Sequence, residues 1–207
     1  MIFTIMNKYL PLILKALLAG LLIGLAGLVY ISIENKILGS FLFSFGLVGV
    51  LLLEANLFTG KVGYINSKDT LIDGLIILVF NLVAAFIVGL VYRLCNGAPA
   101  TAMDSRLAKT WYRLFFDGVG CGALIYLATE CFKRTKNIIP AIICVMAFIL
   151  GGFEHCIADM FYYGASELTW IGLLDILLVI LGNSAGSLLV RFLQVGIENK
   201  KTPTSLN

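Results

Sequence analysis

Four stretches of the sequence are apolar and long enough to cross a lipid bilayer: about 12–33, 70–95, 114–132 and 168–195. A helix needs about 20 apolar residues to span the hydrocarbon core, and only helices and closed barrels satisfy their backbone hydrogen bonds there. Hydrophobic residues make up 60% of the chain and charged residues only 13%, about half the share in a soluble domain. The sequence therefore predicts an all-α integral membrane protein.

Two further apolar segments are interrupted by polar or glycine-containing breaks. Ile37–Leu53 runs into a break at 54–61, and Ile138–Leu150 runs into a break at 151–155. Irregular backbone at membrane depth is tolerated only where protein buries it or where it faces a water-filled cavity. Paired interrupted spans are typical of transport sites built from inverted repeats.

The breaks fall in the second and fifth of six spans, which are equivalent positions of a three-plus-three arrangement. We therefore expect six transmembrane helices as two inverted three-helix repeats, about 8–95 and 106–195, in a single channel domain over 1–207. The apolar run Ala16–Ile33 has no clear cleavage site. We expect it to be retained as the first transmembrane helix rather than removed as a signal peptide.

Lysine and arginine are more frequent at one set of span ends, for example at Lys61, Lys68, Lys133 and Arg134. The positive-inside rule then places both termini in the cytoplasm. We expect the protein in the plasma membrane, the inner membrane of a bacterium, with the lipid bilayer as its surroundings. The net charge of +3 lies in short connecting segments, so it gives no indication of a nucleic-acid partner.

One apolar segment carries three ionisable side chains within six positions. The stretch GFEHCIADM at 152–160 contains Glu154, Asp159 and the only histidine of the chain, His155. A lone histidine is often a packed side chain, but a charged group in the hydrocarbon zone costs roughly 2.5–3.5 kcal/mol and usually faces a cavity. Imidazole also titrates near neutral pH. The stretch therefore predicts a permeation pathway with His155 at its centre.

The same residues do not favour enzyme or cofactor chemistry. A single histidine cannot supply the paired ligands of a zinc protease or a haem site, so we expect no metal and no cofactor. Cys156 and His155 are adjacent, and neighbouring residues on a helix point about 100° apart, which argues against a Cys–His nucleophile. We therefore assign no catalytic residue. An intramembrane enzyme stays as an alternative from another functional class.

The first break supplies a complementary polar group. Thr59, within LFTG at 57–60, brings a hydroxyl and backbone N–H groups that would lie opposite the imidazole if two inverted halves meet at the midplane. Helix N-termini at that depth carry positive partial charge, which favours a small anion. A threonine before glycine is also a common capping residue.

Several short motifs follow one another along the chain. They are FSFGL at 43–47, NLFTG at 56–60, FDGVGC at 116–121, GFEHCIADM at 152–160 and LGNSAG at 181–186. In order and spacing they resemble motifs of the formate/nitrite transporter family, above all its G-F-E-H-S-x-A-N-M signature in the fifth helix and its L-F-T-G/S loop in the second.

The resemblance implies an aquaporin-like protomer of six helices, assembled as a homopentamer with one pore per subunit. It implies passage of small monovalent weak-acid anions such as formate, nitrite, hydrosulfide or lactate. His155 would be the central proton-handling group, with Thr59 and Asp159 beside it in the central pore, and Glu154 and Asn183 would support the structure around the pore. The motifs also imply a hydrophobic constriction and a pore-lining loop, formed by Phe43, Leu47, Phe148, Leu57, Phe58 and Thr59.

Two positions depart from the family pattern. Asp159 replaces the usual asparagine, and Gly122 stands where an asparagine usually follows the cysteine, so two amides are lost near the expected centre. The family's basic residue before the fourth helix corresponds to Arg106 or Lys109, and Lys15 resembles a basic residue of the first helix. We expect these cations to attract anions electrostatically. The lost amides favour a weakly hydrogen-bonded anion such as hydrosulfide.

A bare anion meets a high barrier in a narrow apolar pore, whereas its neutral conjugate acid does not. We therefore expect pH-dependent permeation that links the anion to a proton. A neutral-solute or water pore of the aquaporin type stays as the alternative, because the implied fold is aquaporin-like.

Overall fold

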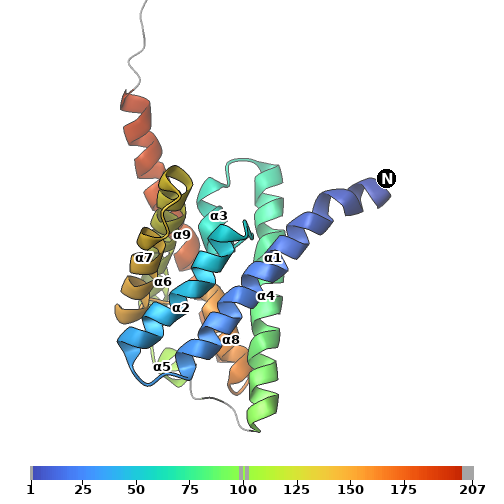
Figure 1. Ribbon diagram of the computed structural model, residues 1–207, viewed down its shortest axis with the longest axis vertical. Helices are drawn as coiled ribbons and strands as arrows, with labels where there is room; N and C mark the ends of the chain where they lie inside the picture. Colours follow the sequence, from blue (N-terminus) through green and yellow to red (C-terminus); the bar gives the residue numbers. More distant parts are fainter. Residues whose placement is uncertain (1, 98–99, 101–102, 202–207) are drawn as a thin grey trace, which may run out of the picture.

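The computed structural model describes residues 2–97, 100 and 103–201, and every regular element in this part of the chain is helical (Figure 1). The described chain contains four helices that are long and apolar enough to cross a membrane: α1 (Ile2–Ile31), α4 (Lys68–Asn96), α6 (Trp111–Thr135) and α9 (Trp170–Lys201). They coincide with the four uninterrupted apolar stretches of the sequence. The predictions of an all-α chain and of these four spans are confirmed.

The two interrupted segments each fold as helices separated by a loop. The first comprises α2 (Lys36–Leu52), the loop 53–57, α3 (Phe58–Lys61) and the 3-10 helix η1 (Val62–Tyr64). The second comprises α7 (Ile139–Leu150), the loop 151–155 and α8 (Cys156–Ala165). A short helix, α5 (Asp104–Leu107), precedes α6. Both loops lie where polar and glycine residues interrupt the apolar pattern.

Local sequence signals explain where several helices begin and end. Ser67 and Thr70 form a capping box at the start of α4, and Gly97 ends that helix in the left-handed conformation, with φ at 67°. Asn35 accepts hydrogen bonds from backbone N–H groups at the start of α2. Pro140 stands in the first turn of α7, where its missing N–H has no intrahelical partner to lose.

The long helices pack in two similar pairs, α1 along α4 and α6 along α9. A Cβ on Gly20 of α1 would clash with the backbone oxygen of Asn81 in α4, and a Cβ on Gly122 of α6 would clash with that of Asn183 in α9. Glycine therefore permits close approach in both pairs. Gly122 faces α9, so the expectation that it marks an amide lost near the centre is wrong: an asparagine side chain has no room there.

The outer surface of the spans is apolar. Exposed side chains on α4 and α9 include Leu75, Val83, Leu181 and Phe192. Such a surface is costly in water and suits contact with lipid tails. In Figure 1, α5 lies at the lower end of the molecule, whereas the N-terminal end of α1 and the C-terminal end of α9 lie toward the upper part. The molecule therefore has two distinct ends.

Candidate functional site

Two cavities of about 490 Å³ each reach into the molecule. The first, which we call the basic vestibule, has among its lining residues Lys15, Glu54, Asn56, Leu57, Lys61, Lys133 and Lys136. The second, which we call the paired vestibule, has among its lining residues Tyr30, Lys36, Phe43, Arg106, Lys109, Phe148, Glu154, His155 and Asp159.

The vestibules lie at opposite ends of the helices that they share. On α1, Lys15 lines the basic vestibule and Tyr30 lines the paired vestibule, and the helix rises about 22 Å between these residues. On α2, Lys36 at the start lines the paired vestibule and Leu52 at the end lines the basic vestibule. The two cavities therefore enter the protomer from opposite ends.

A buried layer lies between the vestibules. Leu47 of α2 is 1% exposed and lies between Phe43, which lines the paired vestibule, and Val50, which lines the basic vestibule. Phe58 and Thr59 of α3 are buried to a similar degree. This layer contains residues that the motifs identified as a constriction, and their role in permeation stays a prediction.

Aromatic rings form the side of the layer that faces the paired vestibule. The Phe148 ring stacks on the His155 ring with centroids 5.8 Å apart, and Phe43 meets Phe148 edge-on at 5.9 Å. Leu57 lines the basic vestibule at the opposite side of the layer. The structure thus brings an apolar group to each side of the histidine.

The two break loops meet inside the layer. Oγ1 of Thr59 lies 3.0 Å from Nε2 of His155, and both side chains are almost fully buried. The backbone N–H of Ala158 donates to Nδ1 of the same ring at 3.2 Å. Because an N–H group can only donate, Nδ1 is the acceptor, and the neutral ring carries its proton on Nε2. His155 therefore donates to the Thr59 hydroxyl, which keeps its own hydrogen for another acceptor.

A buried asparagine of α4 holds the first break loop. The Asn81 side chain accepts a hydrogen bond from the N–H of Phe58 at 2.8 Å and donates to the carbonyl groups of Asn56 and Ala16 at 2.9 and 2.7 Å. The side chain is fully buried. Sequence reasoning missed this residue, and the available signal was an amide in the middle of an apolar span.

A buried asparagine of α9 holds the second break loop in the same way. The Asn183 side chain accepts from the N–H of Cys156 at 3.0 Å and donates to the carbonyl groups of Glu154 and Gly118 at 2.9 and 2.8 Å. The supporting position expected for Asn183 agrees with these contacts. In each case, one amide satisfies an N–H and a carbonyl of the break loop that would otherwise lack partners at membrane depth, and it also ties the loop to a carbonyl of a neighbouring helix.

The backbone of the two loops follows the same path. Glu54 and Gly152 both adopt the left-handed conformation, with φ at 51° and 72°. The N–H of Ala55 donates to the carbonyl of Val50, and the N–H of Phe153 donates to the carbonyl of Phe148, both at 2.9 Å. The two breaks are therefore equivalent pieces of structure, although one contains Leu57 before its second helix and the other contains His155.

Opposite charges fill the wall of the paired vestibule. Nε of Arg106 lies 2.9 Å from Oδ1 of Asp159 and 2.9 Å from Oε2 of Glu154. Nζ of Lys109 lies 2.6 Å from Oε1 of Glu154 and 2.8 Å from Oδ2 of Asp117, which also pairs with Arg113. This cluster of three cations and three carboxylates has no net charge when all its groups are ionised.

The cluster keeps both of its central cations protonated. Burial acts to lower the pKa of Lys109, but hydrogen bonds to Asp117 and Glu154 outweigh it and raise the pKa overall. Burial also acts to lower the pKa of Arg106. The negative charges of Asp159 and Glu154 outweigh this effect, so the pKa lies above its ordinary value. The two alternatives for the family's basic residue, Arg106 and Lys109, both reach the same site, and both are paired with carboxylates.

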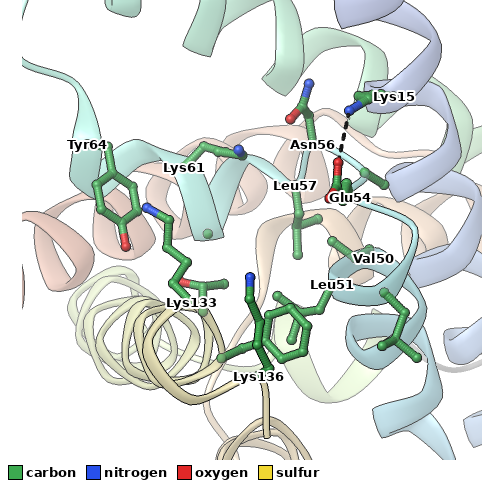
Figure 2. A pocket seen from close by; sticks show the side chains of 15 residues that line it. Lys15, Val50, Leu51, Glu54, Asn56, Leu57, Lys61, Tyr64, Lys133 and Lys136 are labelled. Atoms are coloured by element: carbon green, nitrogen blue, oxygen red, sulfur yellow. Dashed lines mark ion pairs between the residues drawn. The ribbon is translucent and has the colours of Figure 1, made fainter. Parts of the chain in front are cut away.

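The basic vestibule has the opposite character. Its lining contains Lys15, Lys61, Lys133 and Lys136 but a single carboxylate, Glu54, which pairs loosely with Lys15 at 3.9 Å. Figure 2 shows amines of these lysines around one space, with the Lys15 to Glu54 pair at its side. This mouth carries an excess of positive charge.

The family model of formate/nitrite transporters matches residues 4–196. The chain belongs to this family. Proteins of the formate/nitrite transporter family are channels and transporters rather than enzymes. Together with the four apolar spans, membership identifies the chain as an integral membrane protein.

Curated relatives in the formate/nitrite transporter family include the formate channel FocA of Haemophilus influenzae, 27% identical over 150 residues. Another is a probable formate transporter of Methanothermobacter thermautotrophicus, 30% identical over 163 residues. Each match covers 61% of this chain, and the two cover 52% and 60% of the relatives' own length. The chain thus spans little more than half of these proteins.

Two solved structures of the family share the fold. An FNT family ion channel superposes with a TM-score of 0.81 at 24% identity, over 95% of this chain and 92% of that chain. A pentameric formate channel with formate bound superposes with a TM-score of 0.77 at 21% identity, over 95% and 98%. At these identities the likeness establishes the helical fold.

Proposed function

We propose that the protein is a homopentameric membrane channel for small monovalent anions of weak acids, such as formate, nitrite and hydrosulfide. One pore would cross each protomer from the basic vestibule to the paired vestibule. The observation that carries this proposal is the position of the Thr59 to His155 contact, in a buried layer between cavities at opposite ends. The solved pentameric formate channel with formate bound supports the assembly and the substrate class.

We propose further that the protomer consists of two inverted three-helix repeats, about 8–95 and 106–195. The matched contacts of Asn81 and Asn183, each with the break loop of its own half, support this arrangement. The matched close approach at Gly20 and Gly122 also supports it. Broken spans at equivalent positions of two inverted halves are typical of membrane transport sites.

The apolar layer would select for charge state. Phe43, Leu47, Phe148, Leu57 and Phe58 offer an ion no polar side chain, so a bare anion would lose hydration without compensation. The conjugate acid is neutral and crosses such a layer at a much lower barrier. An anion that gains a proton at His155 would therefore pass more readily than one that does not.

The hydrogen bonds of His155 set conditions on that proton. A neutral imidazole that gave up its Nε2 proton would become imidazolate, which is inaccessible near neutral pH. Transfer from Nε2 therefore requires a proton to arrive at Nδ1 first, which breaks the hydrogen bond from Ala158. In the neutral state the ring donates its Nε2 proton to Thr59, and the Thr59 hydroxyl would act as the hydrogen-bond donor to the anion.

The charged residues suggest an orientation and separate roles. The excess of lysine at the basic vestibule supports a cytoplasmic position for that mouth and for both termini, in a plasma membrane. Lys15 would help to attract anions there. Arg106 and Lys109 would attract them more weakly, because both are paired with carboxylates, and Glu154 and Asp159 would hold these cations in the wall of the pore.

Flux of formate, nitrite and hydrosulfide into proteoliposomes across a pH series tests the proposal. The wild-type protein should carry all three, faster at acidic pH, and His155→Phe should remove the pH dependence while keeping the assembly intact. Thr59→Val should slow flux without changing the order of the anions, with Thr135→Val at the exposed end of α6 as the control. Unchanged pH dependence in His155→Phe contradicts the proton role. Swelling in glycerol but not in formate supports the neutral-solute pore instead.

A further inference from the structure

The basic vestibule gathers more positive charge than a monovalent anion can match. Nζ of Lys133 lies 3.6 Å from the centroid of the Tyr64 ring, and Nζ of Lys136 lies 5.5 Å from that of Phe132. Among the described residues, Lys61, Lys133 and Lys136 have no carboxylate within ion-pair distance. Cation–π contacts hold two of these amines in place but leave their charge uncompensated.

Like charges that share one cavity repel each other, and an anion with several charges relieves more of that repulsion than a monovalent anion does. Figure 2 shows Lys61 of α3 around the same space as Lys133 and Lys136, which lie at the end of α6. The loose pair between Lys15 and Glu54 offsets only one positive charge on its rim. The arrangement therefore favours ligands with two or more negative charges.

The shape of the vestibule is also that of a binding site. Its volume of about 490 Å³ lies within the range of about 300–1,000 Å³ found for small-molecule sites. Its walls come from α1, α2, α3, η1 and α6, so protein encloses it on several sides. Its floor is formed by Leu57, which is 2% exposed, and by Gly60. Beyond that floor lies the apolar layer.

We infer that the basic vestibule binds a small soluble anion with two or more charges, of the phosphate or polyphosphate class, which occludes this mouth without crossing the protein. Such an anion meets the lysines in a wet cavity, where it keeps part of its hydration. It cannot follow a monovalent weak acid inward, because one proton does not neutralise it and the apolar layer offers no compensation. The binding step stands without the proposed function, whereas its effect on flux depends on that function.

A phosphate group can come from solution or from an anionic lipid headgroup. Leu57 and Gly60 are buried lining residues of the vestibule, at the end of the first break loop and in the helix after it, in the interior of the protomer. A ligand that reaches them must leave the bilayer surface. This position favours the soluble anion, and a lipid headgroup is the outcome to be tested against it.

Pyrophosphate is a suitable probe, measured by isothermal titration calorimetry on the purified full-length protein in neutral-lipid nanodiscs. Wild-type protein should bind it well above chloride at matched ionic strength, with affinity that falls steeply as salt rises. The double variant Lys133→Gln/Lys136→Gln should bind about tenfold more weakly, which corresponds to about 1.4 kcal/mol. Lys68→Gln is the matched control, since Lys68 is exposed at the start of α4 and outside the vestibule lining.

The result that overturns the inference is pyrophosphate binding no stronger than that of chloride, or an equal loss in the Lys68→Gln control. The inference is also overturned if pyrophosphate does not bind in neutral-lipid nanodiscs and the wild-type protein, but not the double variant, retains phosphatidylglycerol. That result would assign the lysines to a lipid headgroup.

Transport gives the second readout. Pyrophosphate on the side of the basic vestibule should slow formate flux in wild-type proteoliposomes, whereas pyrophosphate on the other side should not, and the double variant should resist it. Calorimetric binding with no formate flux at all would refute the proposed function but keep the binding site. Flux without calorimetric binding would refute the site alone.

Discussion

The two vestibules have similar volumes, and each is lined by residues of one break loop, yet their charges differ. In the first half, the N–H of Asn56 donates to the carbonyl of Lys15, and in the second half, the N–H of Glu154 donates to the carbonyl of Asp117. Asn56 and Glu154 therefore occupy equivalent positions in the two break loops. Lys15 and Asp117 occupy equivalent positions in the helices that these loops contact. One mouth therefore has an excess of amines, and the other has a balanced cluster of ion pairs.

Different residues fix the backbone of the break loops and set the charge of the vestibules. Asn81 and Asn183 satisfy the same three backbone groups in each half, so the break loops keep one geometry. Side chains beside those groups contribute charge without altering the loop. Two break loops with a common backbone can therefore present different charge at the two ends of the protomer.

The strongest test of the common frame is the loss of each amide in turn. Asn81→Leu and Asn183→Leu keep side-chain size but leave one buried N–H and one break-loop carbonyl unpaired, and they remove a further hydrogen bond to a helical carbonyl. At about 1–3 kcal/mol for each such group, both variants should lose on the order of 3 kcal/mol or more of unfolding free energy. Thermal unfolding in detergent measures the loss, with Asn96→Ala at the exposed end of α4 as the control. A large loss in one half and none in the other would break the equivalence.

A smaller effect is expected where the charges differ. Asp159→Asn removes one carboxylate from the paired vestibule, while Arg106 keeps Glu154 as a partner. The vestibule then gains one unit of positive charge, so anion flux from that side at low salt should rise by a few-fold and fall again as salt screens the charge. We also expect a changed order of preference among formate, nitrite and hydrosulfide.

Asp104→Asn is the matched control for this change, because Asp104 is an exposed acid on α5 with the same charge. Equal gains in flux for both variants would mean that general surface charge, not the cluster at Arg106, controls access to the paired vestibule. An unchanged anion order in Asp159→Asn would separate this carboxylate from the pore.

The sequence was sufficient for features that depend on the local pattern along the chain. Apolar length predicted the four long spans, and polar or glycine residues predicted both breaks, because lipid imposes these requirements on each segment alone. The expected juxtaposition of Thr59 and His155 agrees with their hydrogen bond, since it follows once two broken spans face one another.

Features that depend on helix rotation or on irregular segments could not be predicted. The contact of Gly122 with α9 could not be predicted, because no apolar pattern indicates how α6 is rotated. The pairing of Arg106 with Asp159 depends on a connecting segment without periodicity. Asn81 was missed because a single amide in an apolar span does not reveal which backbone groups it satisfies.

The smallest expected effect concerns Glu54, whose equivalent in the second half is Gly152. A residue other than glycine in the left-handed conformation costs roughly 1–2 kcal/mol. Glycine removes this cost, but it raises the entropy of the unfolded chain, which offsets much of the gain in stability. Glu54→Gly should therefore change the unfolding free energy by less than about 1 kcal/mol. It also removes the carboxylate beside Lys15, so pyrophosphate should bind a few-fold more tightly in calorimetry. Glu54→Gln keeps the strained backbone and loses only the charge, so it should tighten pyrophosphate binding equally. No change in binding for either variant would show that Glu54 does not offset the lysines of the basic vestibule.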